Sequence, residues 1–303
     1  MQLTHRLSGA LLGLVVAAGA TTATTATAPA AHAAPPVAHV APVQAAPAHA
    51  ADMPAVLAPA AHVIDATTGR VHFSKEADLR RPVASLTKMM TAYVVLQRAE
   101  PTDKVEVTAD DVRYASAGGA AVAHLRAGDT LTVENLLYAL MLPSGADAAH
   151  ALARAYGPGV EEFVAEMNAT ARRLGMDDTV YVNADGMPYG GGGHSTARDQ
   201  VRLAQAVLEN PTLEKVTSAR YHMVPATSEH GSYSWRNTNR LLGTPGALGV
   251  KTGFTRAAGY TLAFAADRGE SRLVGVLLGE SDSSRRFQTA GALLDWAAAA
   301  VQQ

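Results

Sequence analysis

The 303-residue sequence contains no cysteine, so neither disulfide bonds nor thiolate metal sites are available to it. Aromatic residues make up only 5% of the chain, and there is no run of basic residues. The basic, aromatic-rich surface of a nucleic-acid-binding protein is therefore not expected. None of the eleven histidines forms an H-E-x-x-H pair. We expect a protein that works without nucleic acid, metal ion or cofactor.

The composition is otherwise that of a folded protein. Hydrophobic residues account for 48% of the chain and charged residues for 17%, with a formal net charge of −2. A chain of this length can build one large domain or two moderate ones, each with its own core.

The N-terminal residues 1–33 have the pattern of a secretory signal. A short polar start with His5 and Arg6 precedes an apolar stretch over residues 7–20, and Ala31-His32-Ala33 supplies a small-x-small cleavage site. The apolar stretch is short for a membrane span, although an uncleaved N-terminal anchor is the alternative. The pattern predicts export to an extracytoplasmic space.

Residues 34–54 are rich in alanine, proline, valine and histidine, and they predict a linker without regular helix. The folded domain is then expected over residues 55–303. No second long apolar segment follows, and the last helix has no amphipathic tail, so we expect no membrane span once the signal is removed.

The folded part predicts one early hairpin, a long helical region, and then a late group of strands. The strands are expected at residues 62–65, 71–73, 248–253, 260–266 and 272–278, and the main helices at 84–96, 131–142, 160–174, 195–209 and 283–301. Because the strands do not alternate with helices, they predict one antiparallel sheet built from both chain ends beside a helical lobe. The fold class is therefore α/β of the α+β type, with a site between sheet and lobe.

The segment 84–96 is apolar on every side, which is typical of a buried helix. It nevertheless carries Ser85 and Lys88, three residues apart and so on one helix face. Burial disfavours the charged form of lysine and lowers its pKa. A neutral amine beside a hydroxyl is a general base beside a nucleophile. The alternative is that Ser85 caps the helix and Lys88 extends into solvent.

Two further motifs have the residue types that such a pair would need. Ser144 lies at a break between two predicted helices, from which a hydroxyl can point into a cleft and pass a proton. Lys251-Thr252-Gly253 ends a predicted strand, where a cation and a hydroxyl lie next to a glycine that permits close backbone approach. Each motif alone is also compatible with an ordinary turn or strand end.

Together, the order and spacing of these motifs resemble the low-molecular-mass penicillin-binding proteins, the serine-type D-alanyl-D-alanine carboxypeptidase family. The resemblance covers most of residues 62–296. The matching segments are residues 82–91, Leu142-Pro143-Ser144-Gly145, Leu174-Gly175-Met176, Asp185-Gly186, Ser195-Thr196-Ala197, residues 237–242, residues 251–255 and Ala258-Gly259-Tyr260.

The resemblance implies a penicilloyl-serine-transferase fold, like that of the β-lactamases, and an acyl-enzyme mechanism. Ser85 would attack the penultimate D-alanine of a peptidoglycan stem peptide that ends in D-Ala-D-Ala, and Lys88 would accept its proton. Ser144, with Lys251, would pass a proton to the leaving nitrogen. In a carboxypeptidase, water then cleaves the acyl-enzyme and releases the product. In a transpeptidase, an amine attacks the acyl-enzyme instead. β-Lactam antibiotics would acylate the same serine.

The resemblance also implies the substrate-binding residues. Thr252 would bind the terminal carboxylate, and Gly253 would let the substrate backbone approach. The backbone N–H groups of Ser85 and Phe254 would form the oxyanion hole. An arginine of the last helix would hold the same carboxylate, with Arg286 expected in this role and Arg285 as the alternative.

The sequence departs from the family pattern at Ala146, where the second motif usually ends in asparagine. This departure leaves the strength of substrate positioning open. A β-lactamase, a DD-transpeptidase or DD-endopeptidase with the same residues, and a non-catalytic penicillin-binding protein are the competing functions. A class A β-lactamase would carry a glutamate two residues before Leu-Asn, and no such stretch occurs. We expect a monomer.

Overall fold

A computed structural model describes residues 53–189 and 192–301 of the chain. The predicted signal at 1–33 and nearly all of the predicted linker lie outside the described residues. Within the described ranges, no helix combines the length and the apolar character that crossing a membrane requires.

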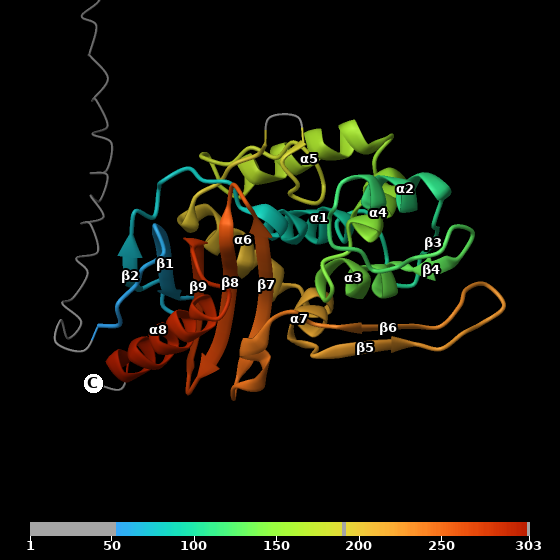
Figure 1. Ribbon diagram of the computed structural model, residues 1–303. Helices are drawn as coiled ribbons and strands as arrows, with labels where there is room; N and C mark the ends of the chain where they lie inside the picture. The colour runs from blue at the N-terminus through green and yellow to red at the C-terminus, as the bar shows by residue number, and fades with distance from the viewer. Residues whose placement is uncertain (1–52, 190–191, 302–303) are drawn as a thin grey trace, which may run out of the picture. The chain divides into compact units, whose positions relative to one another are not determined.

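The centre of the fold is a five-stranded antiparallel sheet in the order β2-β1-β9-β8-β7 (Figure 1). Its strands are β1 (Ala60–Asp65), β2 (Val71–Lys75), β7 (Ala247–Thr255), β8 (Gly259–Arg268) and β9 (Ser271–Glu280). Strand β1 pairs with β9 along its whole length, with Val63 opposite Gly275. The sheet therefore joins the two ends of the folded region, and the prediction of one antiparallel sheet is confirmed.

Helices cover both faces of this sheet, which is why β1 is buried at every position instead of alternating between core and solvent. Helix α8 (Arg285–Val301) packs on β8 and β9 from one side. On the other side α6 (Ala197–Glu209) packs on β1, β8 and β9, and α7 (Pro211–Ser218) packs on β7.

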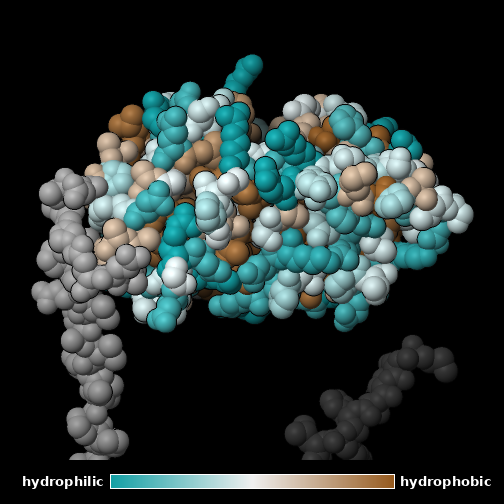
Figure 2. Space-filling model, turned by 90° about the horizontal axis from the view of Figure 1, so that it is seen from below, coloured by the Kyte–Doolittle hydropathy of each residue, from teal (hydrophilic) through white to brown (hydrophobic). Residues whose placement is uncertain are grey.

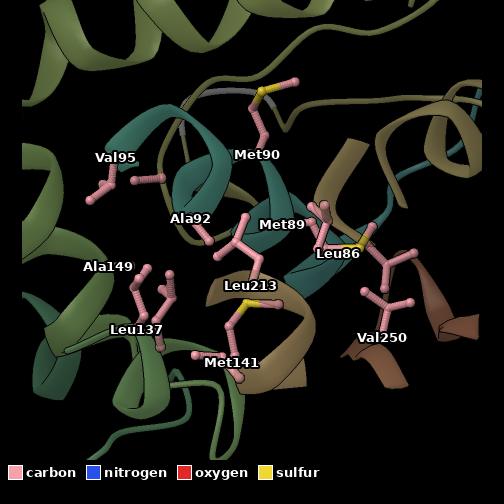
Figure 3. Close-up of a cluster of buried hydrophobic side chains, with 14 of the residues drawn as sticks. Leu86, Met89, Met90, Ala92, Val95, Leu137, Met141, Ala149, Leu213 and Val250 are labelled. Carbon is pink, nitrogen blue, oxygen red and sulfur yellow. The ribbon is translucent and has the colours of Figure 1, made fainter. Parts of the chain in front are cut away.

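The helical lobe is organised around α1 (Thr87–Val95), which contacts α3, α4, α5 and α6. The lobe contains α2 (Ala109–Ala117), α3 (Val133–Met141), α4 (Ala146–Tyr156) and α5 (Val160–Arg173). Figure 3 shows side chains from α1, α3, α4, α7 and β7 meeting in one apolar cluster. The prediction that the 84–96 segment is buried is therefore confirmed.

Two small antiparallel sheets of two strands each complete the described part of the lobe. Strands β3 (Lys104–Glu106) and β4 (Thr130–Thr132) form one, and β5 (Tyr221–Val224) and β6 (Tyr233–Arg236) form the other. On the face shown in Figure 2, hydrophobic residues form small groups separated by hydrophilic ones.

Three local predictions differ from the structure. The segment 84–96 begins with a 3₁₀ turn, η1 (Ala84–Leu86), before the α-helix starts. The β3–β4 pair was not predicted. Helix α7 was not predicted either; it begins at Pro211, and the Asn210 side chain caps it by accepting hydrogen bonds from Thr212 N and Leu213 N.

Candidate active site

Ser85 and Lys88 lie next to each other at the start of α1. The Lys88 Nζ is 3.2 Å from the Ser85 Oγ and donates to the carbonyl oxygen of Asp185 at 2.7 Å. Lys88 is only 1% exposed. Burial lowers the pKa of Lys88 to about 8, although the negative charges of Asp185 and Asp147 oppose the shift. The amine and the hydroxyl thus have the geometry expected of a base and a nucleophile.

The backbone before Ser85 is strained. Ala84 has φ +51°, in the left-handed region that residues with a Cβ rarely adopt. Its carbonyl oxygen approaches Gly186 so closely that a Cβ at Gly186 would clash with it. The turn that contains Gly186 is held by Asn183, whose Oδ1 accepts from Gly186 N at 2.7 Å. The 183–186 turn therefore supports both Ala84 and the Lys88 amine.

Ser144 is also in a strained conformation, with φ +70°. Its side chain is buried, and its Oγ has no hydrogen-bond partner among the described residues. Buried hydroxyls normally have a partner, so the Ser144 Oγ is free to hydrogen-bond to a group that enters this turn.

Lys251 and Thr252 lie on β7, which packs against η1. The buried Lys251 amine donates to Thr252 O at 3.0 Å. Burial, followed by the positive charges of Lys88 and Arg286, holds the pKa of Lys251 well below its usual value. The three cations are therefore close enough to influence one another, as expected for groups of one site.

Thr252 is linked to the turn that carries Ser144. Its hydroxyl lies 2.6 Å from the hydroxyl of Thr238, and Thr238 N donates to Leu142 O at 3.2 Å. Neither Thr238 nor Asp185 had a role predicted from the sequence. The only signal for either was its place within a matching segment of the resemblance.

Gly253 permits a close approach within the protein itself. A Cβ at this position would lie 2.4 Å from Thr261 Oγ1 and 3.0 Å from Ser85 N. Gly253 thus lets β7 pack directly against the turn that carries Ser85. Phe254 follows with an exposed ring that stacks on Tyr260, their centroids 4.4 Å apart.

Arg286 lies on α8, and its side chain contacts β7, the edge strand of the sheet. Its Nη1 donates to Gly253 O at 2.9 Å and to Thr261 O at 3.1 Å. Burial lowers the pKa of Arg286 to about 10. Arg285, the alternative from the sequence, instead pairs with Glu280 at 2.8 Å. Of the two, Arg286 therefore contacts the strand that carries Lys251 and Thr252.

Ala146 is buried at the first turn of α4, where its N donates to Ala121 O at 2.8 Å. The next residue, Asp147, accepts from Ala123 N at 2.9 Å and from Leu125 N at 3.0 Å. The segment beside the Ser144 turn is therefore held by Asp147, while the Ala146 methyl group offers no hydrogen bond.

Two cavities lie beside the residues described above. One, of about 460 Å³, is lined by residues that include Ala84, Asn183 and Thr255. The other, of about 1020 Å³, is lined by residues that include Thr238 and Arg286.

Known proteins share this fold and sequence. A family model described as D-alanyl-D-alanine carboxypeptidase matches residues 47–282. The D-alanyl-D-alanine carboxypeptidase of Streptomyces sp. strain K15 is 36% identical over 82% of this chain and 90% of its own length. The carboxypeptidase DacF of Bacillus subtilis is 33% identical over 79% of this chain, which spans 62% of DacF.

Among solved structures, the crystal structure of the Streptomyces K15 DD-transpeptidase superposes with a TM-score of 0.76 at 36% identity, covering 80% of this chain and 97% of the other. The resemblance inferred from the motifs is confirmed by these matches. The chain belongs to the D-alanyl-D-alanine carboxypeptidase family, peptidase family S11.

Proposed function

We propose that the protein is a serine-type D-alanyl-D-alanine carboxypeptidase that acts on peptidoglycan stem peptides through an acyl-enzyme. The observation that carries this proposal is the buried Lys88 amine, 3.2 Å from the Ser85 hydroxyl. Family membership supports the same reaction and the same substrate class.

In the acylation step, Lys88 in its neutral form accepts the proton of Ser85. The Ser85 Oγ attacks the carbonyl carbon of the penultimate D-alanine, and the C–N bond to the terminal D-alanine breaks. The leaving nitrogen takes a proton through Ser144, whose hydroxyl has no partner within the described part of the chain. Water then cleaves the ester and regenerates Ser85.

Substrate binding would use the edge strand β7. The Thr252 hydroxyl, with its partner Thr238, and the Arg286 guanidinium surround the position proposed for the terminal carboxylate. The backbone N–H groups of Ser85 and Phe254 would stabilise the oxyanion. Lys251, close to Lys88 and Arg286, would keep this region positive.

DD-transpeptidation with the same residues is the second candidate. The similarity to the Streptomyces K15 DD-transpeptidase favours it. The two reactions share the acyl-enzyme and differ only in whether water or an amine attacks it.

The test is incubation of the purified protein with a stem pentapeptide that ends in D-Ala-D-Ala, with and without an added amine acceptor. Release of D-alanine without a cross-linked product establishes the carboxypeptidase, whereas a product that retains the acceptor establishes the transpeptidase. Labelled penicillin should form a long-lived adduct. Turnover of that adduct within seconds would instead indicate a β-lactamase.

We predict that Ser85→Ala abolishes both D-alanine release and penicillin labelling, because it removes the attacking oxygen. Activity should fall by at least about 10³-fold. The exposed Ser116→Ala change on α2 serves as the control, with unchanged labelling. Full labelling of the Ser85→Ala protein would show that another residue is the nucleophile.

We further propose export through the segment 1–33 and a monomeric mature enzyme. The support for export is the polar start, apolar stretch and small-x-small site of that segment. Mass spectrometry of the secreted protein should place its N-terminus directly after Ala33, and sedimentation should give the mass of one chain.

A further inference from the structure

Thr261 lies on β8, directly opposite Gly253 of β7 in the register of the sheet. Its side chain is 0% exposed, and no step of the proposed mechanism uses it. Buried polar groups are hydrogen-bonded almost without exception, so the partners of such a residue show which parts of the fold it holds in place.

The Thr261 hydroxyl holds the turn that carries Ser85. Its Oγ1 donates to Val83 O at 3.1 Å, and the same oxygen accepts from Leu86 N at 3.3 Å. The next residue is Ala84, whose φ of +51° is a strained conformation that persists only where its surroundings fix it. The hydrogen bond from β8 is such a restraint, because it fixes the carbonyl group immediately before Ala84. The direction of the Ser85 N–H follows from the conformation of Ala84.

The same hydroxyl lies beside the proposed oxyanion hole. A Cβ on Gly253 would lie 2.4 Å from Thr261 Oγ1 and 3.0 Å from Ser85 N. It would also lie 3.1 Å from Val83 O, so these three atoms surround one small space. The Ser85 N–H is one of the two groups proposed to stabilise the oxyanion, and Phe254, which supplies the other, follows Gly253 on β7. The Thr261 side chain therefore packs directly beside the oxyanion donors.

The backbone of Thr261 contacts the carboxylate-binding part of the site. Its carbonyl oxygen accepts from Arg286 Nη1 at 3.1 Å, and the same nitrogen donates to Gly253 O at 2.9 Å. This bond is made by the main chain, so a substitution of the Thr261 side chain leaves its acceptor in place. One residue thus connects the Ser85 turn with the arginine proposed to bind the terminal carboxylate.

We propose that Thr261 is a positioning residue for the acylation step, an inference that rests on the proposed function. Its hydroxyl fixes the Ser85 N–H at the place where the oxyanion forms, without touching the substrate. Loss of the hydroxyl should slow acylation, because a displacement of about 1 Å in a reacting site can cost as much as about 10²-fold in rate. Binding of the terminal carboxylate should be kept, because the backbone makes the contact with Arg286.

The test compares transition-state stabilisation with substrate binding in Thr261→Val. Valine has nearly the shape of threonine but cannot donate a hydrogen bond to Val83 O. Transition-state stabilisation is measured as kcat/KM for D-alanine release from the stem pentapeptide, and as the affinity for the boronic acid analogue of N-acetyl-D-alanine. This boronic acid forms a tetrahedral anion on Ser85 and therefore reports on the oxyanion hole.

Substrate binding is measured separately, as the Kd of a fluorescent pentapeptide on the full-length Ser85→Ala protein with and without Thr261→Val. We expect kcat/KM and the affinity for the boronic acid to fall together by about tenfold to a hundredfold, part of the roughly 10²–10³-fold that loss of an oxyanion donor costs. The Kd of the pentapeptide should stay within about twofold. Thr261→Ser, which keeps the hydroxyl, should recover most of the rate.

Thr217→Val is the matched control. Thr217 is also 0% exposed, and its hydroxyl donates to Leu248 O at 3.0 Å, on the same strand as Gly253. The change removes a buried hydrogen bond of the same kind, and urea unfolding should show a similar loss of stability. Its kcat/KM should stay within about twofold of the parent, because Leu248 does not belong to the Ser85 turn. Should Thr261→Val fail to fold, Thr261→Ala removes the same hydroxyl with a smaller side chain.

An unchanged kcat/KM in Thr261→Val would overturn the inference, as would an equal loss in Thr217→Val or a failure of Thr261→Ser to recover the rate. A lower kcat/KM with an unchanged affinity for the boronic acid would also overturn it, since the oxyanion hole would then be intact. A failure of the proposed function is seen separately in the parent protein, which would neither release D-alanine nor take up labelled penicillin, and both proposals would then fall.

Discussion

At Lys88, opposing electrostatic effects decide whether the amine carries a proton. Burial removes water from the ammonium group and lowers its pKa. The charges of Asp185 and Asp147 act in the opposite direction. The outcome is a pKa of about 8 for Lys88, close enough to neutrality for the amine to act as a base.

We predict that acylation by penicillin rises with pH and levels off above about 8. Only the neutral amine accepts the serine proton, so below the pKa of Lys88, about 8, the rate should increase nearly tenfold per pH unit. Stopped-flow acylation between pH 6 and pH 10 measures this profile.

Lys88→Arg is the matched change, because it keeps a cation that does not lose its proton in this range. The Lys88→Arg protein should react with penicillin too slowly for a plateau to appear in its pH profile. A parent profile that is flat from pH 6 to pH 10 would contradict the role of Lys88 as the base.

At the scale of elements, the helical lobe is held together by a buried carboxylate between α2 and α4. Asp111, fully buried, accepts from the Nδ1 of His150 at 2.6 Å and from Arg154 Nη2 at 3.0 Å. It also completes a capping box with Thr108 at the start of α2. Burial alone would raise the pKa of Asp111, but the hydrogen bonds from His150 and Arg154 hold it well below its usual value.

We predict that Asp111→Asn lowers the free energy of unfolding by about 3 kcal/mol at pH 7, because it leaves buried donors of α4 without their charged partner. The pKa of Asp111 is lower in the folded protein than its unfolded value of 3.8. The contribution of the ionised Asp111 to stability is therefore complete above pH 3.8, and it is lost as the pH falls below that value. Urea unfolding at pH 7 and at pH 3 measures the difference in the free energy of unfolding between the parent and the Asp111→Asn protein. This difference should be smaller at pH 3.

Asp110→Asn, at the exposed neighbouring carboxylate, is the control for that change. Surface substitutions of this kind usually alter stability by less than about 0.5 kcal/mol. Equal losses for the two variants would show that the buried hydrogen-bond network contributes nothing specific.

For the molecule as a whole, the sheet separates two apolar clusters. The larger one lies between the sheet and the lobe and surrounds α1. The smaller one lies under α8 and includes Phe264, Leu277 and Leu293. Ser85 and Lys88, the proposed catalytic pair, lie on the side of the larger cluster. Arg286 lies on α8, the helix that covers the smaller cluster.

We predict that Leu293→Ala destabilises the protein by about 2–5 kcal/mol, through loss of buried methyl groups and the cavity left behind. For a domain of this size, Tm should fall by roughly 5–15 °C. Thermal unfolding measures the change, and the exposed Gln288→Ala on the same helix is the control. Penicillin acylation at 25 °C should stay within about twofold of the parent, since the changed residue lies across the sheet from Ser85.

Local sequence patterns by themselves determined the elements and the pairs that lie within one element. The Ser85–Lys88 pair could be predicted because a spacing of three residues in a helical segment places two side chains on one face. The Thr132 N-cap of α3 and the end of α5 before Gly175 follow in the same way from short-range hydrogen bonding.

Contacts between distant segments were decided only by the tertiary structure. The contact of Arg286 with Gly253, the Thr238–Thr252 contact and the support of Lys88 by Asp185 each join residues from separate elements. The larger cavity likewise gathers residues from the β5–β6 hairpin, the segment after it and α8. Neighbours along a helix follow from its fixed repeat, but neighbours across the fold depend on how the sheet and helices pack, which no short spacing in the sequence encodes.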